Sequence, residues 1–199
     1  MINHIYKKIS RFIIIFSFLS FTCNNIVSNS ESNSITNPKY NSTNEGLCIY
    51  VTKVDINSDL SYQDINLAYT ELIGEPIISY DKIISYDTSN YIITLSFSSD
   101  SLKKRIAQVS AYDEAVGVYG LPFVVTLDRE KIYGGWFWTP VSSIPCHSVV
   151  ILLDNIFDSL KTNEIKIQLG YPNVNQFKGI DPRNNRKIIE QLIKDNKVK

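Results

Sequence analysis

The chain has 199 residues, of which 20 are Lys or Arg and 20 are Asp or Glu, so its formal net charge at pH 7 is zero. A chain without an excess of basic residues lacks the positive field that holds phosphates, so we expect no nucleic-acid partner. The length is enough for one domain with a hydrophobic core, or for a small domain with an appended subdomain.

The N-terminus has the pattern of an export signal. Two lysines and an arginine lie within residues 7–11, the apolar run Phe12–Phe21 follows them, and Cys23 comes shortly after. The run is too short to cross a hydrocarbon core of about 30 Å, which takes about 20 apolar residues. A basic region followed by a short apolar run is typical of a cleaved signal. We therefore predict export, with residues 1–22 as a signal peptide.

Leu19–Cys23 resembles the cleavage motif of bacterial lipoproteins, in which the cysteine is lipidated and becomes the mature N-terminus. The family prefers Leu three residues before the cysteine and Gly or Ala directly before it, whereas Ser20 and Thr22 stand here. The resemblance implies a palmitate-type anchor at Cys23 and a bacterial envelope protein facing the periplasm or the cell surface. The alternative is ordinary cleavage after Thr22, which also fits a small-x-small site and gives a secreted soluble protein.

The stretch after the expected cleavage site is polar. Residues 23–45 are dominated by Asn, Ser and Thr, and such a sequence cannot bury enough apolar surface to offset the entropy of ordering. We expect it to be a disordered tether between the lipid on Cys23 and a globular domain at residues 46–199. Removal of the signal leaves 17 basic and 20 acidic residues, a net charge of −3.

The rest of the chain predicts an α+β domain. Helical patterns occur weakly at Ile65–Ile73, clearly after Ser99 or Asp100, and at a terminal helix that Pro182 opens. The connections have hairpin-like lengths rather than regular βαβ spacing, so we expect a mainly antiparallel sheet with one or two packed helices. The predicted strands lie at residues 47–52, 91–97, 123–127, 131–138, 149–153 and 165–169.

One part of this domain resembles a known family. From Ile84 to Trp138 the order is strand, strand, capped helix, and then Pro122–Asp128 followed by Ile132. This resembles the periplasmic head subdomain of the SecD translocase subunit, although Arg129 stands where that family has a turn glycine. The likeness implies a fold and not secretion activity. The mature chain as a whole resembles the small uncharacterised lipoproteins of Bacteroidetes-type bacteria, which implies no particular chemistry.

Two cysteines remain in the mature domain, Cys48 and Cys146. An even pair in an exported protein is a candidate disulfide, which would close a loop of about 100 residues. The alternative is two buried free thiols, because unpaired cysteine behaves as a small hydrophobe.

The candidate binding residues are Tyr133, Trp136 and Trp138. On a regular strand both tryptophans share one face, and exposed Trp pairs stack on sugars or anchor protein contacts. The alternative is that these rings fill the core. Asp87 and Asp128 are carboxylates that an enzyme would need beside such a platform.

We expect neither a catalytic constellation nor a cofactor or metal site. His147 is the only histidine outside the signal segment, and it follows Cys146 directly, so the two side chains of a strand would point to opposite faces. The primary hypothesis is a lipid-tethered, non-enzymatic binding or structural domain of the envelope, acting on a protein partner. The alternative is a glycan-binding module or hydrolase that uses the aromatic strand at residues 133–138.

Overall fold

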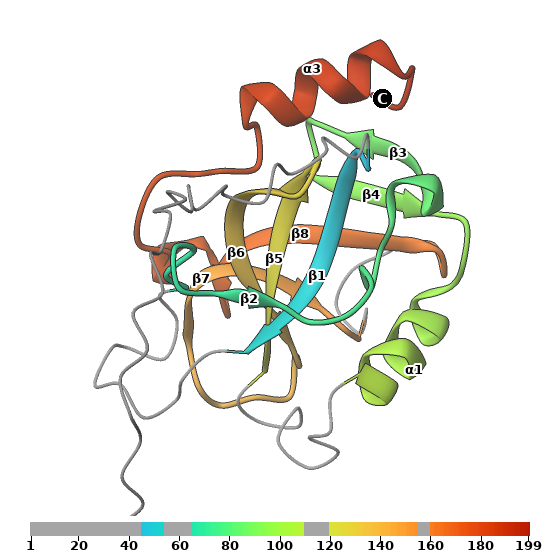
Figure 1. Cartoon of the computed structure of the whole chain (residues 1–199). Helices are drawn as coiled ribbons and strands as arrows, with labels where there is room; N and C mark the ends of the chain where they lie inside the picture. Colours follow the sequence, from blue (N-terminus) through green and yellow to red (C-terminus); the bar gives the residue numbers. More distant parts are fainter. Residues whose placement is uncertain (1–44, 54–64, 110–119, 155–159) are drawn as a thin grey trace, which may run out of the picture. The chain divides into compact units, whose positions relative to one another are not determined.

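The computed structural model describes residues 45–53, 65–109, 120–154 and 160–199. The predicted signal, the lipidation site and nearly all of the tether lie outside these ranges. The described residues form an α+β fold with one eight-stranded, mostly antiparallel sheet and two helices (Figure 1). The expected fold class is therefore confirmed at this level.

The strand order in the sheet is β2-β1-β5-β6-β7-β8-β4-β3. All neighbours pair antiparallel except β6 and β7, which are parallel. The strands are β1 (Leu47–Lys53), β2 (Glu71–Leu72), β3 (Ile83–Asp87), β4 (Ile92–Leu95), β5 (Leu121–Leu127), β6 (Glu130–Trp138), β7 (Cys146–Leu152) and β8 (Glu164–Tyr171). The α-helices are α1 (Ser99–Val109) and α3 (Arg186–Lys194), and two short 3-10 helices are η1 (Tyr80–Lys82) and η2 (Val174–Gln176).

The hairpin of β5 and β6 forms as the sequence predicts. Its two turn residues, Asp128 and Arg129, have φ values of 49° and 68°, the pair of left-handed conformations that a type I′ turn requires. Glycine inside a strand indicates either a bulge or a close approach of a neighbouring group. Gly135 is paired regularly with Phe123, so no bulge lies at this glycine. A Cβ there would lie 2.4 Å from the Phe123 ring, so a close approach accounts for the glycine.

The sheet wraps around one core. Alternate side chains of β1, β5, β6, β7, β8 and β4 join a single buried cluster with Ile83 and Tyr86 of β3, so these strands surround the same space. Ile78 pairs with Ile49 of β1 shortly before the chain enters β3, and this brings the two ends of the strand order together. Leu102 and Ile106 of α1 add to the same cluster. We call this side of the sheet the inner face.

The outer face carries a second buried cluster on β6 and β7. Lys131 holds the turn after Ile65 against this region, because its Nζ donates to the carbonyl oxygens of Leu67 and Thr70. The cluster consists of Trp136, Trp138, Cys146 and Val150, with Ile65, Ile144, Leu152 and Tyr171 packed against it.

The C-terminal segment closes one end of the sheet. Helix α3 lies across the end where β5 meets β6 (Figure 1), and Ile188 and Leu192 are buried in the core. The chain then runs beside β3. There the backbone N–H of Tyr86 donates to the carbonyl oxygen of Lys197, and the Tyr86 carbonyl oxygen accepts from the N–H of Lys199. The Lys197 Nζ also donates to the Tyr80 and Ile83 carbonyls. We call residues 197–199 the C-terminal latch.

Two of the predicted helices differ from the structure. The weak pattern at Ile65–Ile73 contains turns and the short strand β2 instead of a helix, because Glu71 and Leu72 pair with β1. The terminal helix begins at Arg186 rather than at Pro182. Its N-cap is Asn185, whose side chain accepts from the N–H of Lys187.

Candidate functional site

The aromatic strand is buried. Tyr133, Trp136 and Trp138 are 8 %, 5 % and 2 % exposed, and the two tryptophan rings pack edge to face with centroids 6.4 Å apart. The tryptophans share the outer face, as strand alternation predicts, whereas Tyr133 joins the inner core. Rings in these positions fill cores and present no surface to a sugar or a partner. This corrects the expectation that Tyr133, Trp136 and Trp138 form a binding platform.

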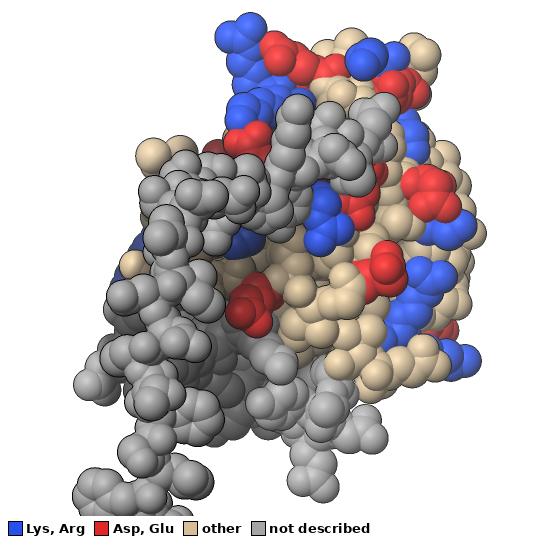
Figure 2. All heavy atoms as spheres, viewed as in Figure 1, with Lys and Arg blue, Asp and Glu red and all other residues tan. Residues whose placement is uncertain are grey.

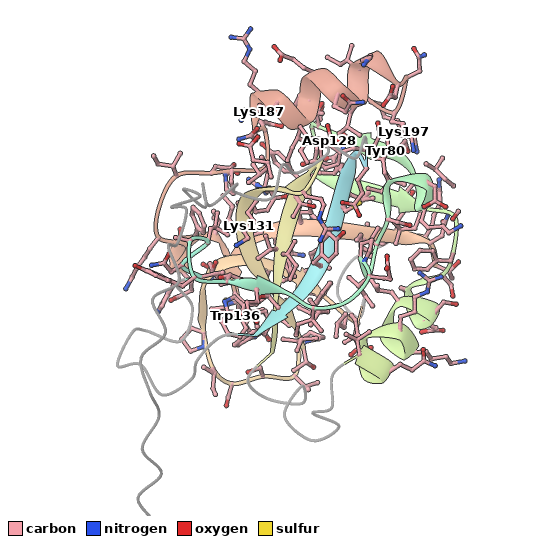
Figure 3. The ribbon with its side chains drawn as sticks, in the orientation of Figure 1. Tyr80, Asp128, Lys131, Trp136, Lys187 and Lys197 are labelled. Carbon is pink, nitrogen blue, oxygen red and sulfur yellow. The ribbon has the colours of Figure 1, made fainter. Side chains whose placement is uncertain are left out.

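Neither predicted carboxylate lies beside these rings. Asp87 accepts hydrogen bonds from the Asn90 side-chain amide and from the backbone N–H groups of Asn90 and Ser89. These bonds stabilise the β3–β4 turn and lower the pKa of Asp87, the Asn90 side-chain bond most of all. Asp128 accepts from the N–H of Gly46 at 2.7 Å. The β5–β6 turn at Asp128 is about 20 Å along the strand from Trp136, six residue steps from its pairing partner. Figure 3 shows Asp128 at the α3 end of the sheet and Trp136 at the other.

The two cysteines of the domain are free and buried. Cys48 lies on β1 and Cys146 on β7, with β5 and β6 between them. Three strand spacings separate the two by about 14 Å along the sheet, well beyond the ~7 Å that a disulfide tolerates. The structure therefore agrees with the second possibility from the sequence, two buried free thiols. Burial raises the pKa of both Cys48 and Cys146 to about 11.

His147 has a structural contact. Its Nδ1 lies 2.7 Å from the carbonyl oxygen of Gln176 in η2, and its own carbonyl accepts from the N–H of Lys178. These bonds fasten the chain after β8 onto β7. Within the ranges that the structure describes, no three His, Cys, Asp or Glu side chains gather in a way that would hold a metal ion.

The strongest candidate for a site lies on β8, where the strand loses a neighbour. Ile167 donates its N–H to the carbonyl oxygen of Tyr91 at 2.8 Å, and β4 begins at the next residue, Ile92. Leu169 is two residues further along β8, so its backbone N–H and C=O point to the same edge as those of Ile167, away from β7. Among the described residues, no strand continues along that edge. We call this place the β8 notch.

Arg183 forms one wall of the notch. Its guanidinium lies 3.5 Å from the centre of the Tyr91 ring and donates to the Ile167 carbonyl through Nη1. Asp181 accepts from Nε and Nη2 at 2.9 and 2.7 Å. This two-bond pairing lowers the pKa of Asp181 and fixes the orientation of the Arg183 guanidinium. Arg183 is therefore fixed at the point where β4 ends.

A hollow of about 590 Å³ opens at the notch. Its opposite wall is the turn after β8, which contains a cis peptide bond between Tyr171 and Pro172 and leads into η2. Among the residues that the structure describes, the lining contains two cationic residues, Lys166 and Arg183, and no acidic one. The described residues that line it are Leu152, Lys166, Gln168, Leu169, Gly170, Tyr171, Pro172, Asn173, Val174 and Arg183.

Sequence reasoning missed this site. Its ingredients are strand residues, a turn and a single arginine that is distant in sequence from β4, and none of them forms a motif. The one available signal was Tyr171-Pro172, because a proline directly after a strand marks the end of its pairing. On the face shown in Figure 2, by contrast, basic and acidic side chains are interspersed over α3 and the neighbouring surface.

Comparisons with known proteins add no family. No family model matches the chain, and no curated protein or solved structure is significantly similar to it. The resemblances to SecD and to small lipoproteins therefore stay predictions. In the part of the chain that the structure describes, no helix combines the length and the apolar character needed to span a membrane.

Proposed function

We propose that this chain is an exported, lipid-anchored protein of the bacterial envelope with a non-enzymatic binding role, and that the β8 notch is its binding surface. The observation that carries the first part is the order of the N-terminal sequence: basic residues, the apolar run Phe12–Phe21, Cys23 and then a polar stretch. This order places a lipid anchor at one end of a flexible tether and a folded domain at the other.

The notch supports the binding role because it combines a hollow with polar groups that converge on it. The fixed guanidinium of Arg183 and the outward-facing backbone of Leu169 give it directional donors and an acceptor, and Leu152 and Val174 add apolar wall. Ligand sites typically combine an apolar lining with a few placed polar groups. The alternative, a glycan-binding module or hydrolase, needed an exposed aromatic strand, and its rings are buried.

Fatty-acid labelling tests the anchor. The full chain and its Cys23→Ser variant are expressed in a Gram-negative host that is fed a radiolabelled palmitate, and each is followed in membrane and soluble fractions. We expect label and membrane association for the unchanged chain and loss of both in Cys23→Ser. Cys48→Ser is the matched control, because it removes a buried thiol from the domain and should keep the label.

Retention of label on Cys23→Ser would contradict the lipid anchor. An unlabelled, soluble mature chain that begins at Cys23 would instead favour the secreted alternative. An uncleaved chain in the cytosolic fraction would contradict export altogether.

A further inference from the structure

We propose that a hollow in the sheet, between Tyr133 and Gly134 of β6 and Ser148 and Val149 of β7, binds a small carboxylate with an apolar tail, such as a short fatty acid. We call this hollow the β6–β7 gap. Among the described residues it shares no lining residue with the β8 notch, so this inference goes beyond the function proposed above and does not depend on it. Three features carry it: the parting of the two strands, the donors at the opening and the apolar walls.

β6 and β7 stop pairing before either strand ends. Their parallel pairing begins only at Gly135 and Val149. β6 itself starts at Glu130 and β7 at Cys146, and the register of β7 with β8 also shifts between Cys146 and Val149. A hollow of about 360 Å³ opens where the strands part, and this volume is at the lower end of the range for small-molecule sites.

Because the strands part, residues of both sheet faces border one space. Val149 and Phe177 pack in the inner core, whereas Ile65 packs against the outer cluster. In a continuous sheet, side chains on the two faces lie on opposite sides of the backbone. All three residues line the β6–β7 gap, so the hollow reaches from the outer face into the wall of the fold. In Figure 1 the chain that leads from η2 to α3 and the turn after Ile65 lie on the same side of the sheet.

The first donor at this opening is a backbone N–H group. The Trp138 carbonyl accepts from the N–H of Leu153, and Gly134 lies an even number of residues before Trp138, so its N–H and C=O also point toward β7. Pairing between the strands stops before Gly134 is reached. The His147 carbonyl, which the parallel register places opposite this N–H, accepts from Lys178. Among the described residues the Gly134 N–H therefore has no partner, and it faces the gap.

Three side chains add donors. The hydroxyl groups of Tyr133 and Ser148 and the ammonium group of Lys178 belong to residues that line the gap. In the described part of the chain, neither hydroxyl has a hydrogen-bond partner and Lys178 has no ion pair. Asp181 is close to Lys178 in sequence, but Arg183 binds its carboxylate through two hydrogen bonds.

This set of donors favours a ligand that accepts hydrogen bonds. The described lining offers one N–H group, two hydroxyl groups and one cation, and it contains no carboxylate. A carboxylate on the ligand matches these groups, because charge-assisted hydrogen bonds are about twice as strong as neutral ones. An alcohol would lack the charge, and an ammonium group would be repelled by Lys178.

The rest of the lining is apolar and suits an alkyl tail. Ile65, Phe177 and Ile180 border the gap, and the side chain of Ile180 is 93 % exposed. A ligand tail that covers these side chains gains affinity from the apolar area that both remove from water. Placed donors in a largely apolar hollow therefore favour an alkyl carboxylate over an inorganic anion.

Isothermal titration calorimetry tests the proposal with the Cys23→Ser chain, because the detergent that an anchored chain requires would compete for an apolar site. The probes are octanoate, octanol and octylammonium at neutral pH, which share one tail and differ in the head group. We expect octanoate to saturate one site, octanol to bind about tenfold more weakly and octylammonium to show no binding. Added salt should weaken the binding of octanoate alone.

Two variants test the head-group contacts. Lys178→Met removes the cation and should weaken octanoate binding about tenfold without changing octanol binding. Lys161→Met is the matched control, because the side chain of Lys161 is 75 % exposed and lies outside the lining, and it should bind octanoate as the parent chain does. Tyr133→Phe keeps the buried ring, removes only the hydroxyl group and should weaken octanoate binding about fivefold.

A second pair of variants tests the tail contacts. Ile180→Ser should weaken octanoate and octanol alike, by about threefold, because both probes lose the same apolar contact. Val141→Ser is the control, since Val141 is 76 % exposed and outside the lining, and it should leave both affinities unchanged.

Equal binding of the three probes, or equal octanoate affinity of Lys178→Met and Lys161→Met, would overturn carboxylate recognition. The absence of octanoate binding, or equal affinities of Ile180→Ser and Val141→Ser, would overturn the site itself. Neither result bears on the β8 notch or on the lipid anchor. Thermal unfolding shows whether each variant is folded, and the exposed positions 178 and 180 keep the test decisive if Tyr133→Phe does not fold.

Discussion

At the scale of single residues, burial decides what the side chains on this sheet are able to do. Cys48 and Cys146 are 0 % exposed, and Trp136 and Trp138 are nearly as enclosed. Desolvation disfavours a charged form, so a buried thiol stays protonated. The two cysteines and two tryptophans, which the sequence suggests as disulfide-forming or ligand-binding residues, therefore fill the interior of the fold.

The thiol pKa values give a direct prediction. At pH 8 the thiolate fractions of Cys48 and Cys146 fall about 100-fold, because burial raises their pKa from 9.0 to about 11. We expect the folded Cys23→Ser chain to resist iodoacetamide at pH 8 and to gain two carbamidomethyl groups in 6 M guanidinium chloride without reductant. Mass spectrometry of the intact chain measures both.

Fast alkylation of the folded chain would contradict the burial of these thiols. No alkylation in denaturant until a reductant is added would show a disulfide, the pairing that the structure does not contain.

At the scale of elements, the β5–β6 hairpin organises the sheet, and its return strand depends on one glycine. A Cβ at Gly135 would lie 2.4 Å from the Phe123 ring and 2.8 Å from the Val149 carbonyl oxygen, which belong to the strands on either side. Neither neighbour gives way without disturbing the core or a strand. Glycine is therefore needed at this position for space rather than for backbone freedom.

We predict that Gly135→Ala lowers the free energy of unfolding by about 2–3 kcal/mol, the upper part of the usual cost of overpacking a core. Urea denaturation followed by tryptophan fluorescence measures it. Gly74→Ala is the control, because a Cβ there meets no atom within 4 Å although φ is 59°. Its cost of about 1 kcal/mol would come from the left-handed backbone alone. If Gly135→Ala cost no more than this control, the close approach would be refuted.

At the scale of the whole described fold, segments outside the named strands pair with strands near both ends of the sheet. Ile78 bridges to β1, and the C-terminal latch covers the free edge of β3 through its bonds to Tyr86. Lys197 strengthens the latch by donating to two carbonyl groups and lying 4.2 Å from the centre of the Tyr80 ring. An uncovered strand edge is a template for pairing with another chain, so the latch shields this edge of β3.

Deletion of residues 197–199 is therefore expected to lower the free energy of unfolding by about 2–4 kcal/mol, since each lost hydrogen bond contributes about 1 kcal/mol. The truncated chain should also form oligomers in light scattering. Lys197→Met keeps the two backbone bonds to Tyr86 and removes the two side-chain bonds, so it should cost about half as much and form no larger species than the unchanged chain. An unchanged unfolding midpoint for the truncated chain would contradict the role of the latch.

The sequence by itself determined most of the local structure. Runs of β-branched and aromatic residues predicted β1, β4, β5, β6, β7 and β8, and the helical periodicity after Ser99 or Asp100 predicted α1, because these signals depend on near neighbours. The side chain that accepts a backbone N–H at the start of α1 is Ser98, one residue before the predicted cap. It also showed that Trp136 and Trp138 share a face. It placed the start of the terminal helix too early, since Pro182 and Asn185 are both good helix-start signals and only packing of Ile188 selects between them.

Only the tertiary structure decided which face of each strand is covered and which edge is free. Whether Trp136 is buried depends on Ile65 and Tyr171, which come from distant parts of the chain. Whether the β8 edge is open depends on where β4 stops and on Arg183 reaching it. These are contacts between residues far apart in sequence, and no local pattern encodes them. The sequence therefore suggested an anchor and a fold class, and the long-range pairing located the candidate site.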